Sequence, residues 1–344
     1  MTIKVTDFGA MPNGEQIQHV VIQNANGHQL GLVSFGASWQ SFITAEGKEL
    51  VLGFNDAAGY LNNGYYLGNA VGRVAGRLDS ATFDLNGKTY KLDANEGKNT
   101  LHGGQNNFSH KNWDIANLDE AKNSVTFATT MTEDEDHFPG TMGTTVTYTL
   151  TDDNQVRIDF SATSDQDTLY NPTSHVYFNV AGLNTDAREL ELKLNSPRHL
   201  EFRDDQIPTG KRLETAGTPF DFQTAIKIGD NIAKIDSDAF DKKFDDAFEI
   251  VHQAGEPDAI LKDLKSGRAV EMTTDRNAVI FFITNPEVDL HDDQEAFLAE
   301  HPFNGVALEA QTLSDAIHNP EFGDIVLPAN QNQHYTTTYA FKNI

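Results

Sequence analysis

Apolar and polar residues alternate in short runs along most of this chain. In the run at 144–150 the apolar side chains Val146, Tyr148 and Leu150 occupy every second position, and the run at 156–160 repeats the pattern. Successive side chains of a strand point to opposite faces, so each run could bury one face and leave the other face polar. A period of two residues therefore predicts strands through much of the sequence.

Turn residues separate these runs. Asn26-Gly27 and Asn86-Gly87 each lie between two of them. Asn-Gly favours a type I′ turn, because both central residues of that turn need positive φ, and the turn joins antiparallel strands. Further strands are expected at 190–194, 259–264 and 279–283.

Helical periodicity is scarce. The stretch 295–300 (EAFLAE) could form one or two turns of helix, and 238–241 little more. Dense strands without long helical segments between them predict an all-β fold with few short helices, a sandwich or a barrel, rather than βαβ units. The acidic cluster at 133–136 (EDED) is expected to be a solvated loop.

Composition limits the classes of function. The chain has 344 residues, no Pro/Gly/Ser-rich linker and no cysteine, so we expect one domain over residues 1–344 and neither disulfides nor thiolate chemistry. We find no secretory signal and no apolar run of the ~18 residues that span a bilayer, which favours a cytoplasmic protein. The formal charge of −26 would repel nucleic acid and anionic membranes, whereas a neutral small molecule would be indifferent to it. Monomer and homodimer are both compatible with the sequence.

His175 stands in a segment that could carry proton-transfer chemistry. In Asn171–Val180 (NPTSHVYFNV), strand alternation puts His175, Tyr177 and Asn179 on one face and apolar side chains on the other. With the apolar face in the core, the three polar groups would line a cleft. The alternative is a solvated sheet face that bears an ordinary histidine.

His102 and Glu309 are the other candidates. His102 precedes Gly103-Gly104 in NTLHGG. Glycines allow the backbone to approach a ligand closely. The alternative is a tight turn that follows a histidine without any role in binding. Glu309 lies in an apolar strand (VALEAQ) and shares a face with Gln311. Burial would raise the pKa of Glu309 toward that of a useful base, whereas an edge strand would leave it facing water.

Other chemistries are weakly supported. His, His and Glu match a catalytic zinc ligand set in type, but HExxH and HxH spacings are absent, so we expect no metal. The glycines and the two arginines Arg73 and Arg77 at 68–78 suggest a phosphate loop, yet neither GxxxxGK[ST] nor GxGxxG occurs. A serine nucleophile elbow, GxSxG, is also absent. We therefore expect no cofactor.

These segments, in this order, resemble the aldose 1-epimerase (galactose mutarotase) family. From about Val71 to the C-terminus the chain carries GR-x-x-x-R, N-x-LHGG, N-x-T-x-H-x-YFN, D-x-x-F and LE-x-Q. The resemblance implies a large antiparallel β-sandwich with a sugar-binding cleft on one sheet. It agrees with the strand pattern.

The resemblance also implies roles for individual residues. Glu309 would be the general base, His175 the general acid, and His102 would lie beside the ring oxygen of a sugar. Arg77 and Asp245 would hold sugar hydroxyls, and Asp245 is preferred over Asp246 because the spacing D-x-x-F aligns it with Phe248. Tyr177 would complete the substrate-binding set.

The expected function is cofactor-independent interconversion of the α and β anomers of a free aldose of the galactose or glucose type. Gly76 stands where the family often has Asn, and Ile280 where it often has a substrate-facing Gln; Ser174 and Val176 depart from the pattern as well. These departures leave open an epimerase of a disaccharide such as maltose. A hexose 6-phosphate is also open, because Lys242-Lys243 lies beside Asp245. A non-catalytic sugar-binding module is the alternative from a different class.

Overall fold

The computed structural model describes residues 2–235, 244–284 and 303–344. Within these ranges the regular secondary structure consists almost wholly of antiparallel strands, with only short helices. The predicted all-β fold is therefore confirmed. The helical stretches expected at 238–241 and 295–300 lie outside the described residues, as does the lysine pair at 242–243.

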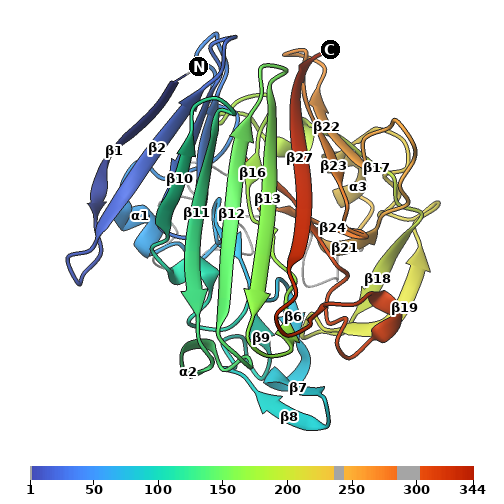
Figure 1. Ribbon diagram of the computed structural model, residues 1–344. Coiled ribbons are helices and arrows are strands. Elements are labelled where there is room, and N and C mark those ends of the chain that lie inside the picture. The colour runs from blue at the N-terminus through green and yellow to red at the C-terminus, as the bar shows by residue number, and fades with distance from the viewer. Residues whose placement is uncertain (1, 236–243, 285–302) are drawn as a thin grey trace.

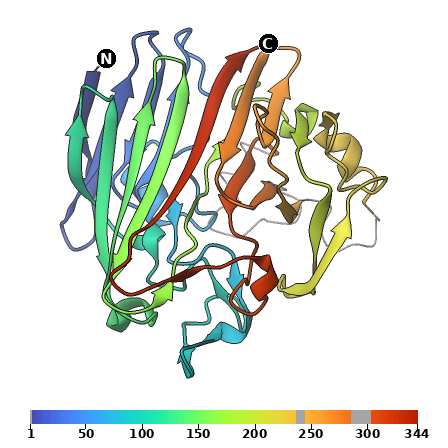
Figure 2. The same cartoon turned by 45° about the vertical axis from the view of Figure 1, so that its right-hand side comes forward.

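Two large sheets form the body of the sandwich (Figures 1 and 2). The nine-stranded sheet has the order β10 (Asp114–Asp119), β11 (Ser124–Met131), β12 (Met142–Leu150), β13 (Gln155–Ser164), β27 (Gln333–Asn343), β23 (Arg268–Thr274), β22 (Ala259–Asp263), β17 (Glu191–Leu194) and β20 (Ile226–Lys227). The six-stranded sheet has the order β16 (Tyr177–Phe178), β25 (Val306–Gln311), β24 (Ala278–Ile283), β21 (Asp245–Glu249), β18 (Arg198–Phe202) and β19 (Pro208–Glu214).

Smaller elements complete the fold. A four-stranded sheet at the N-terminus contains β1 (Thr2–Ala10), β2 (Gln16–Gln23), β3 (Gln29–Val33) and β4 (Ser38–Ile43). The two-stranded pairs are β5 (Ala70–Val71) with β15 (Thr173–Ser174), β6 (Arg77–Leu78) with β9 (Thr100–Leu101), β7 (Thr82–Leu85) with β8 (Lys88–Lys91), and β14 (Thr168–Leu169) with β26 (Val326–Leu327). The helices are α1 (Ala57–Leu61), α2 (Glu133–Asp136) and α3 (Ile228–Ile232), with 3₁₀ turns η1 (Asp79–Ala81), η2 (Phe108–His110), η3 (Ala187–Glu189) and η4 (Pro320–Phe322).

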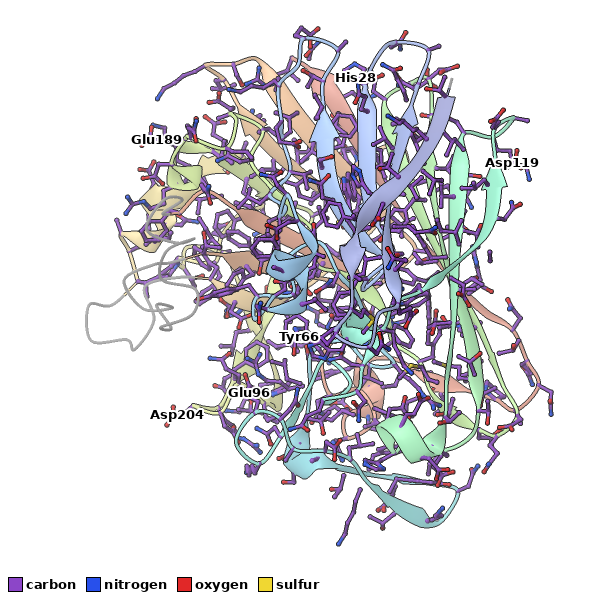
Figure 3. All side chains as sticks on the ribbon, turned by 90° about the vertical axis from the view of Figure 1, so that its left-hand side faces the viewer. His28, Tyr66, Glu96, Asp119, Glu189 and Asp204 are labelled. Carbon is purple, nitrogen blue, oxygen red and sulfur yellow. The ribbon has the colours of Figure 1, made fainter. Side chains whose placement is uncertain are left out.

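The main core lies between the sheets and follows the alternation of the sequence. Val146 and Tyr148 of β12 pack in the same apolar cluster as Phe281 of β24 and Leu308 of β25. Side chains fill the space between the layers when the molecule is viewed from its N-terminal sheet (Figure 3). The opposite face of the six-stranded sheet does not pack in this main core.

Both Asn-Gly pairs lie between paired antiparallel strands, as predicted, but only one of them forms the type I′ turn. Asn86 and Gly87 have φ of 53° and 77°, as a type I′ turn requires, and they join β7 to β8. At Asn26-Gly27 only the glycine has positive φ. The Asn24 side chain accepts hydrogen bonds from the backbone N–H groups of Asn26 and His28, and these bonds favour a longer turn.

The acidic cluster at 133–136 is not a solvated loop. It forms α2, and Asp136 is buried against the fully buried guanidinium of Arg73, with N–O distances of 2.6 and 2.9 Å. Arg73 also donates to the carbonyls of Met131, Pro139 and Gly140. Arg73 therefore links α2 and the residues on either side of it to the core. It does not form part of a phosphate loop.

Candidate active site

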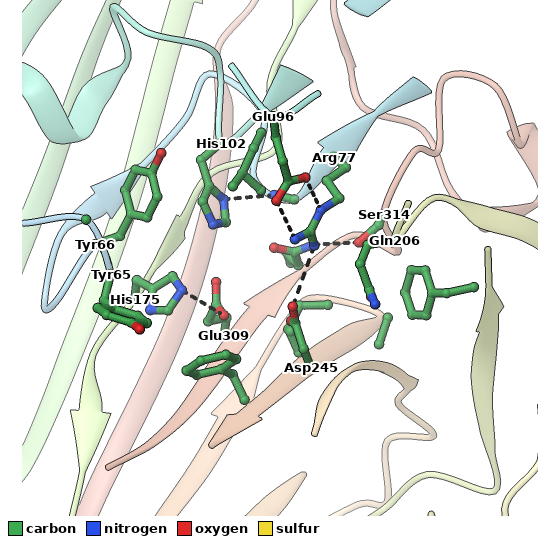
Figure 4. A pocket seen from close by; sticks show the side chains of 18 of the residues that line it. Tyr65, Tyr66, Arg77, Glu96, His102, His175, Gln206, Asp245, Glu309 and Ser314 are labelled. Carbon is green, nitrogen blue, oxygen red and sulfur yellow. Dashed lines mark hydrogen bonds and ion pairs between the residues drawn. The ribbon is translucent and has the colours of Figure 1, made fainter. Parts of the chain in front are cut away.

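A cavity of about 230 Å³ lies on the face of the six-stranded sheet that points away from the main core. All six of the residues predicted for the site line it: Arg77, His102, His175, Tyr177, Asp245 and Glu309. Figure 4 shows how five of them, Arg77, His102, His175, Asp245 and Glu309, lie around the cavity. The neighbouring Asp246 does not line it, as the choice of Asp245 anticipated.

Strand register builds the floor of the cavity. Glu309 of β25 is directly opposite Ile280 of β24, which is in turn opposite Ala247 of β21. These three positions alternate with the core residues Leu308 and Phe281, so they all face the cavity. The glutamate thus projects from a floor that is otherwise apolar.

Glu309 occupies an environment that disfavours its charge. Its side chain is 3% exposed, and Oε2 has no hydrogen-bond partner among the described residues. Burial raises the pKa of Glu309 well above its ordinary value, and the nearby Asp245 adds to the shift while Arg77 opposes it. A desolvated oxygen without a partner is ready to accept a hydrogen bond from a ligand.

His175 faces Glu309 at a distance of 3.3 Å between Nε2 and Oε1. It lies in the short break between β15 and β16, where its backbone N–H donates to Asn69 and its carbonyl accepts from Gly68. The ring stacks on Tyr177 with centroids 5.0 Å apart. Burial lowers the pKa of His175 to about 4, although Asp245 acts in the opposite direction.

The alternation predicted for this segment holds with one exception. Val176 and Phe178 enter the core while His175 and Tyr177 face the cavity. Asn179, which was expected on the cleft face, is fully buried and donates its amide hydrogens to the carbonyls of Thr185 and Asn304. Asn179 is therefore a structural residue.

The pKa shifts of Glu309 and His175 determine which of the two groups holds the proton before a ligand binds. The sequence suggested an ionised Glu309 and a protonated His175 as the reactive form. Burial favours the neutral forms of both groups, so the proton that they share resides on Glu309 when the cavity is empty of ligand. Both descriptions carry one proton on the pair, and a titration would report on the pair as a unit.

His102 approaches from the NTLHGG loop. Its Nδ1 accepts a hydrogen bond from the backbone N–H of Gly76 at 3.1 Å, so a neutral ring carries its proton on Nε2. Burial, together with the charges of His175 and Arg77, lowers the pKa of His102 well below its ordinary value. His102 is therefore a neutral hydrogen-bond donor rather than a second acid.

Glycine after His102 is required by close backbone contact. A Cβ at Gly103, where φ is 89°, would lie 2.3 Å from the carbonyl oxygen of Gly72. His102 itself has φ of 53°, an uncommon value for a residue with a side chain. This loop geometry holds the imidazole over the cavity.

Arg77 extends into the cavity between two carboxylates. Glu96 accepts from Nε and Nη2 of Arg77, the latter at 2.8 Å, and Asp245 Oδ2 lies 3.7 Å from Nη1. Such a bidentate pair fixes the guanidinium plane. Arg77 and Asp245 together offer donors and an acceptor to ligand hydroxyl groups.

Tyr177 has a different position from that expected of a residue that binds substrate through its hydroxyl. Its hydroxyl donates to the backbone carbonyl of Tyr65 at 2.9 Å, and its ring packs edge-on against Phe282. The aromatic face supports His175. Its proposed contact with a substrate would involve the ring more than the hydroxyl.

Sequence reasoning missed several residues that line the cavity. Tyr66 packs edge-on against His102 with centroids 4.6 Å apart, and Glu96 orients Arg77. Gln206 and Ser314 lie at the other end of the cavity (Figure 4). These four residues come from loops, where no strand pattern marks them.

The three groups His102, His175 and Glu309 could also hold a metal ion. Their ligand atoms lie within 4.8 Å of one another, whereas tetrahedral zinc with bonds of ~2.1 Å brings its ligands to about 3.4 Å. The side chains would have to move closer to bind zinc. The sequence expectation of a metal-free site stays a prediction.

Solved structures define the fold class of this chain. The galactose 1-epimerase from Lactobacillus acidophilus superposes with a TM-score of 0.85 at 22% identity and 99% coverage of both chains. An aldose epimerase homologue from C. elegans superposes with a TM-score of 0.84 at 25% identity, covering 95% of this chain and 99% of that one. The architecture is that of the galactose mutarotase-like proteins.

Sequence comparison identifies the family. The aldose 1-epimerase family model matches residues 18–340. The chain is 39% identical over 333 residues to the maltose epimerase of Levilactobacillus brevis, covering 96% of each, and 32% identical to the galactose mutarotase of Bos taurus, covering 88% and 89%. The chain belongs to the aldose 1-epimerase family, and it is an isomerase of the mutarotase class.

Some expectations extend beyond these comparisons. Among the described residues no helix combines the length and the apolar character that crossing a membrane demands. The cytoplasmic location, the single domain over residues 1–344, and the monomeric or dimeric state stay predictions.

Proposed function

We propose that this protein interconverts the α and β anomers of a free aldose by acid–base catalysis without a cofactor. The observation that carries the proposal is the buried pair of Glu309 and His175, 3.3 Å apart in a cavity of the family fold. Their side chains are only 3% and 8% exposed, so a proton exchanged between them and a sugar is shielded from water. Paired proton transfer is the chemistry that ring opening requires.

In the proposed mechanism a bound sugar first redistributes the shared proton. Its anomeric hydroxyl donates to Glu309 Oε2, which favours the ionised carboxylate, and the proton of the pair passes to His175. Glu309 then takes the proton of the anomeric hydroxyl while His175 delivers its proton to the ring oxygen. The bond between C1 and the ring oxygen breaks, and an open-chain aldehyde forms.

Closure reverses the two roles. After rotation about the C1–C2 bond, the hydroxyl formed from the ring oxygen attacks the other face of the aldehyde and returns its proton to His175. Glu309 returns a proton to the carbonyl oxygen of the aldehyde, which becomes the new anomeric hydroxyl, so the pair ends with the one proton it began with. His102 supplies a neutral donor beside the ring oxygen, and Arg77 and Asp245 hold the remaining hydroxyls.

A reducing disaccharide is a second candidate substrate. One relative, 39% identical to this chain, is named a maltose epimerase. Ile280 and Ala247 offer no hydrogen bond on the cavity floor, and Gly76 presents no side chain, so these three positions make no polar side-chain contact with a single hexose.

The charges of the cavity argue against a sugar phosphate. Of its described lining residues the only cation is Arg77, and that guanidinium already faces Glu96 and Asp245. A phosphate would meet more negative than positive charge there. The Lys242-Lys243 pair that suggested this substrate lies outside the described residues.

The test is polarimetry of freshly dissolved single anomers of galactose, glucose, maltose and glucose 6-phosphate, with spontaneous mutarotation subtracted. We expect acceleration of the neutral sugars and little of the phosphate. Calorimetric binding of these sugars without any acceleration would favour the sugar-binding module instead and would refute the proposal.

A further inference from the structure

The hairpin that joins β18 to β19 brings an uncommon backbone conformation to the cavity. Gln206 in its turn has φ of 59°, and its side chain lines the cavity. Glycine or asparagine would adopt this left-handed conformation at lower cost, so a glutamine here suggests that its side chain is used. Phe202, the last residue of β18, lines the same end of the cavity.

Ion pairs hold this turn in place. Arg203 forms paired contacts with Asp205, at 2.8 and 2.9 Å, and with Asp79, at 2.9 and 3.1 Å. Lys98 lies 3.3 Å from Asp205, and the Asn99 amide donates to the Asp205 carbonyl at 3.3 Å. The turn is thereby fixed to the loop that carries His102. In Figure 3 the tip of the turn, marked by Asp204, lies near Glu96 of that loop.

The position of Gln206 relates to the proposed chemistry. In Figure 4 Gln206 lies across the cavity from His175, with Asp245 and Arg77 between them. A sugar that reacts at Glu309 and His175 has its anomeric carbon there. The ring carbon opposite the anomeric carbon then points toward Arg77 and the Gln206 turn. A second sugar attached at that carbon would leave the first site at this end.

We propose that Phe202 and Gln206 form a subsite for the second sugar unit of a reducing disaccharide linked through the ring carbon opposite its anomeric centre. The inference rests on the proposed anomerase activity. The Phe202 ring offers a face for the C–H surface of a sugar, and the Gln206 amide offers both a donor and an acceptor to its hydroxyls. The cavity floor at Ile280 and Ala247 is apolar and makes no hydrogen bond to the linkage.

The experiment compares kcat/KM for maltose and glucose, measured by polarimetry, in wild type, Gln206→Gly and Phe202→Leu. Gln206→Gly removes the amide and accepts the same positive φ, so the turn should stay folded. We expect the maltose-to-glucose ratio of kcat/KM to fall about fivefold to tenfold in each variant, the effect of about one hydrogen bond or one ring contact. Asn330→Gly, at an exposed position with φ of 60° outside the cavity, is the matched control and should leave both rates unchanged.

The outcomes separate the two proposals. Wild type that accelerates no aldose would remove the proposed function, and the subsite with it. Wild type that accelerates glucose but not maltose would overturn the subsite alone. An unchanged maltose-to-glucose ratio in both variants would also overturn it, even if both rates fell together. A fall of the ratio in either variant, with Asn330→Gly unaffected, would support it.

Discussion

Replacement of Glu309 by glutamine is the sharpest test of the proposed mechanism. The amide has the shape of the carboxylic acid and can keep the contact with His175, so the fold and the cavity should persist. It cannot take a proton from the anomeric hydroxyl. Loss of a positioned general base typically lowers the rate by ~10²–10⁴.

The low pKa of His175 raises the lower end of the expected loss of rate. In the wild type its proton comes from Glu309, 3.3 Å away. In Glu309→Gln the acid must be His175 protonated from solvent, and a pKa of about 4 leaves roughly one molecule in a thousand protonated at pH 7. We therefore expect a loss of kcat/KM at pH 7 of ~10³ or more.

The pH dependence gives a second, independent signature. In the wild type the pair is active with one proton, which it retains between the lowered pKa of His175, about 4, and the raised pKa of Glu309. Activity should therefore fall on the acid side near pH 4, far below the ordinary imidazole value of 6.5. In Glu309→Gln the residual activity should increase as the pH is lowered from 7 toward 4, because His175 becomes protonated.

The assay is polarimetry of fresh α-D-glucose between pH 4 and 9, with kcat/KM reporting on the free enzyme. Glu96→Gln is the control, since Glu96 lines the same cavity but contacts Arg77 rather than His175. It should raise KM and keep both limbs of the profile. The reasoning fails if Glu309→Gln retains a tenth of the wild-type rate, if the acid limb lies at pH 6.5 or above, or if Glu96→Gln loses as much as Glu309→Gln.

Three other outcomes are expected. Arg77→Lys should raise KM for glucose about tenfold or more with a smaller change in kcat. Lysine cannot make the bidentate contact with Glu96 that fixes the Arg77 guanidinium between Glu96 and Asp245. A larger effect on kcat than on KM would argue against a binding role. Asp136→Asn should lower the free energy of unfolding, measured in urea, by about 3–5 kcal/mol because the guanidinium of Arg73 stays buried without its counter-ion, and a change under 1 kcal/mol would contradict this. Dialysis against EDTA should leave the polarimetric rate unchanged, and recovery of a lost rate by zinc would instead assign a metal to His102, His175 and Glu309.

Much of the fold follows from local pattern. The alternation at 144–150 and 156–160 predicted β12 and β13, because a strand with one buried face needs that pattern. The turn at Asn86-Gly87 followed from backbone preference alone. The acidic run at 133–136 was misjudged because its burial depends on Arg73, some 60 residues earlier in the chain and adjacent only in the fold.

The candidate site was predictable as a set of residues but not as a geometry. The resemblance supplied Glu309, His175, His102, Arg77 and Asp245, and all line one cavity. Their distances depend on long-range pairing: Tyr177 of β16 opposite Ala307 of β25 brings His175 to Glu309 across more than a hundred residues. No local pattern encodes such a register.

The loop residues of the cavity illustrate the same limit. Glu96 and Gln206 lie in segments without strand periodicity. Only the fold shows that Glu96 contacts Arg77, and that Asp79 pairs with Arg203 of the turn that carries Gln206. The directions of the pKa shifts of Glu309 and His175 were also beyond the reach of the sequence. Burial raises the pKa of Glu309 and lowers that of His175, and burial is a property of the assembled molecule.

Burial also determines which group of the pair holds the proton before a sugar binds. In water a glutamate and a histidine, with ordinary pKa values of 4.5 and 6.5, would leave the proton on the histidine. In the cavity the pKa of Glu309 rises and that of His175 falls, so the order of their proton affinities is reversed. Anomerisation needs each group to act once as acid and once as base. Because burial places the proton on Glu309, the hydrogen bond from a ligand hydroxyl to Oε2 has to favour the ionised carboxylate before His175 can act as the acid of ring opening.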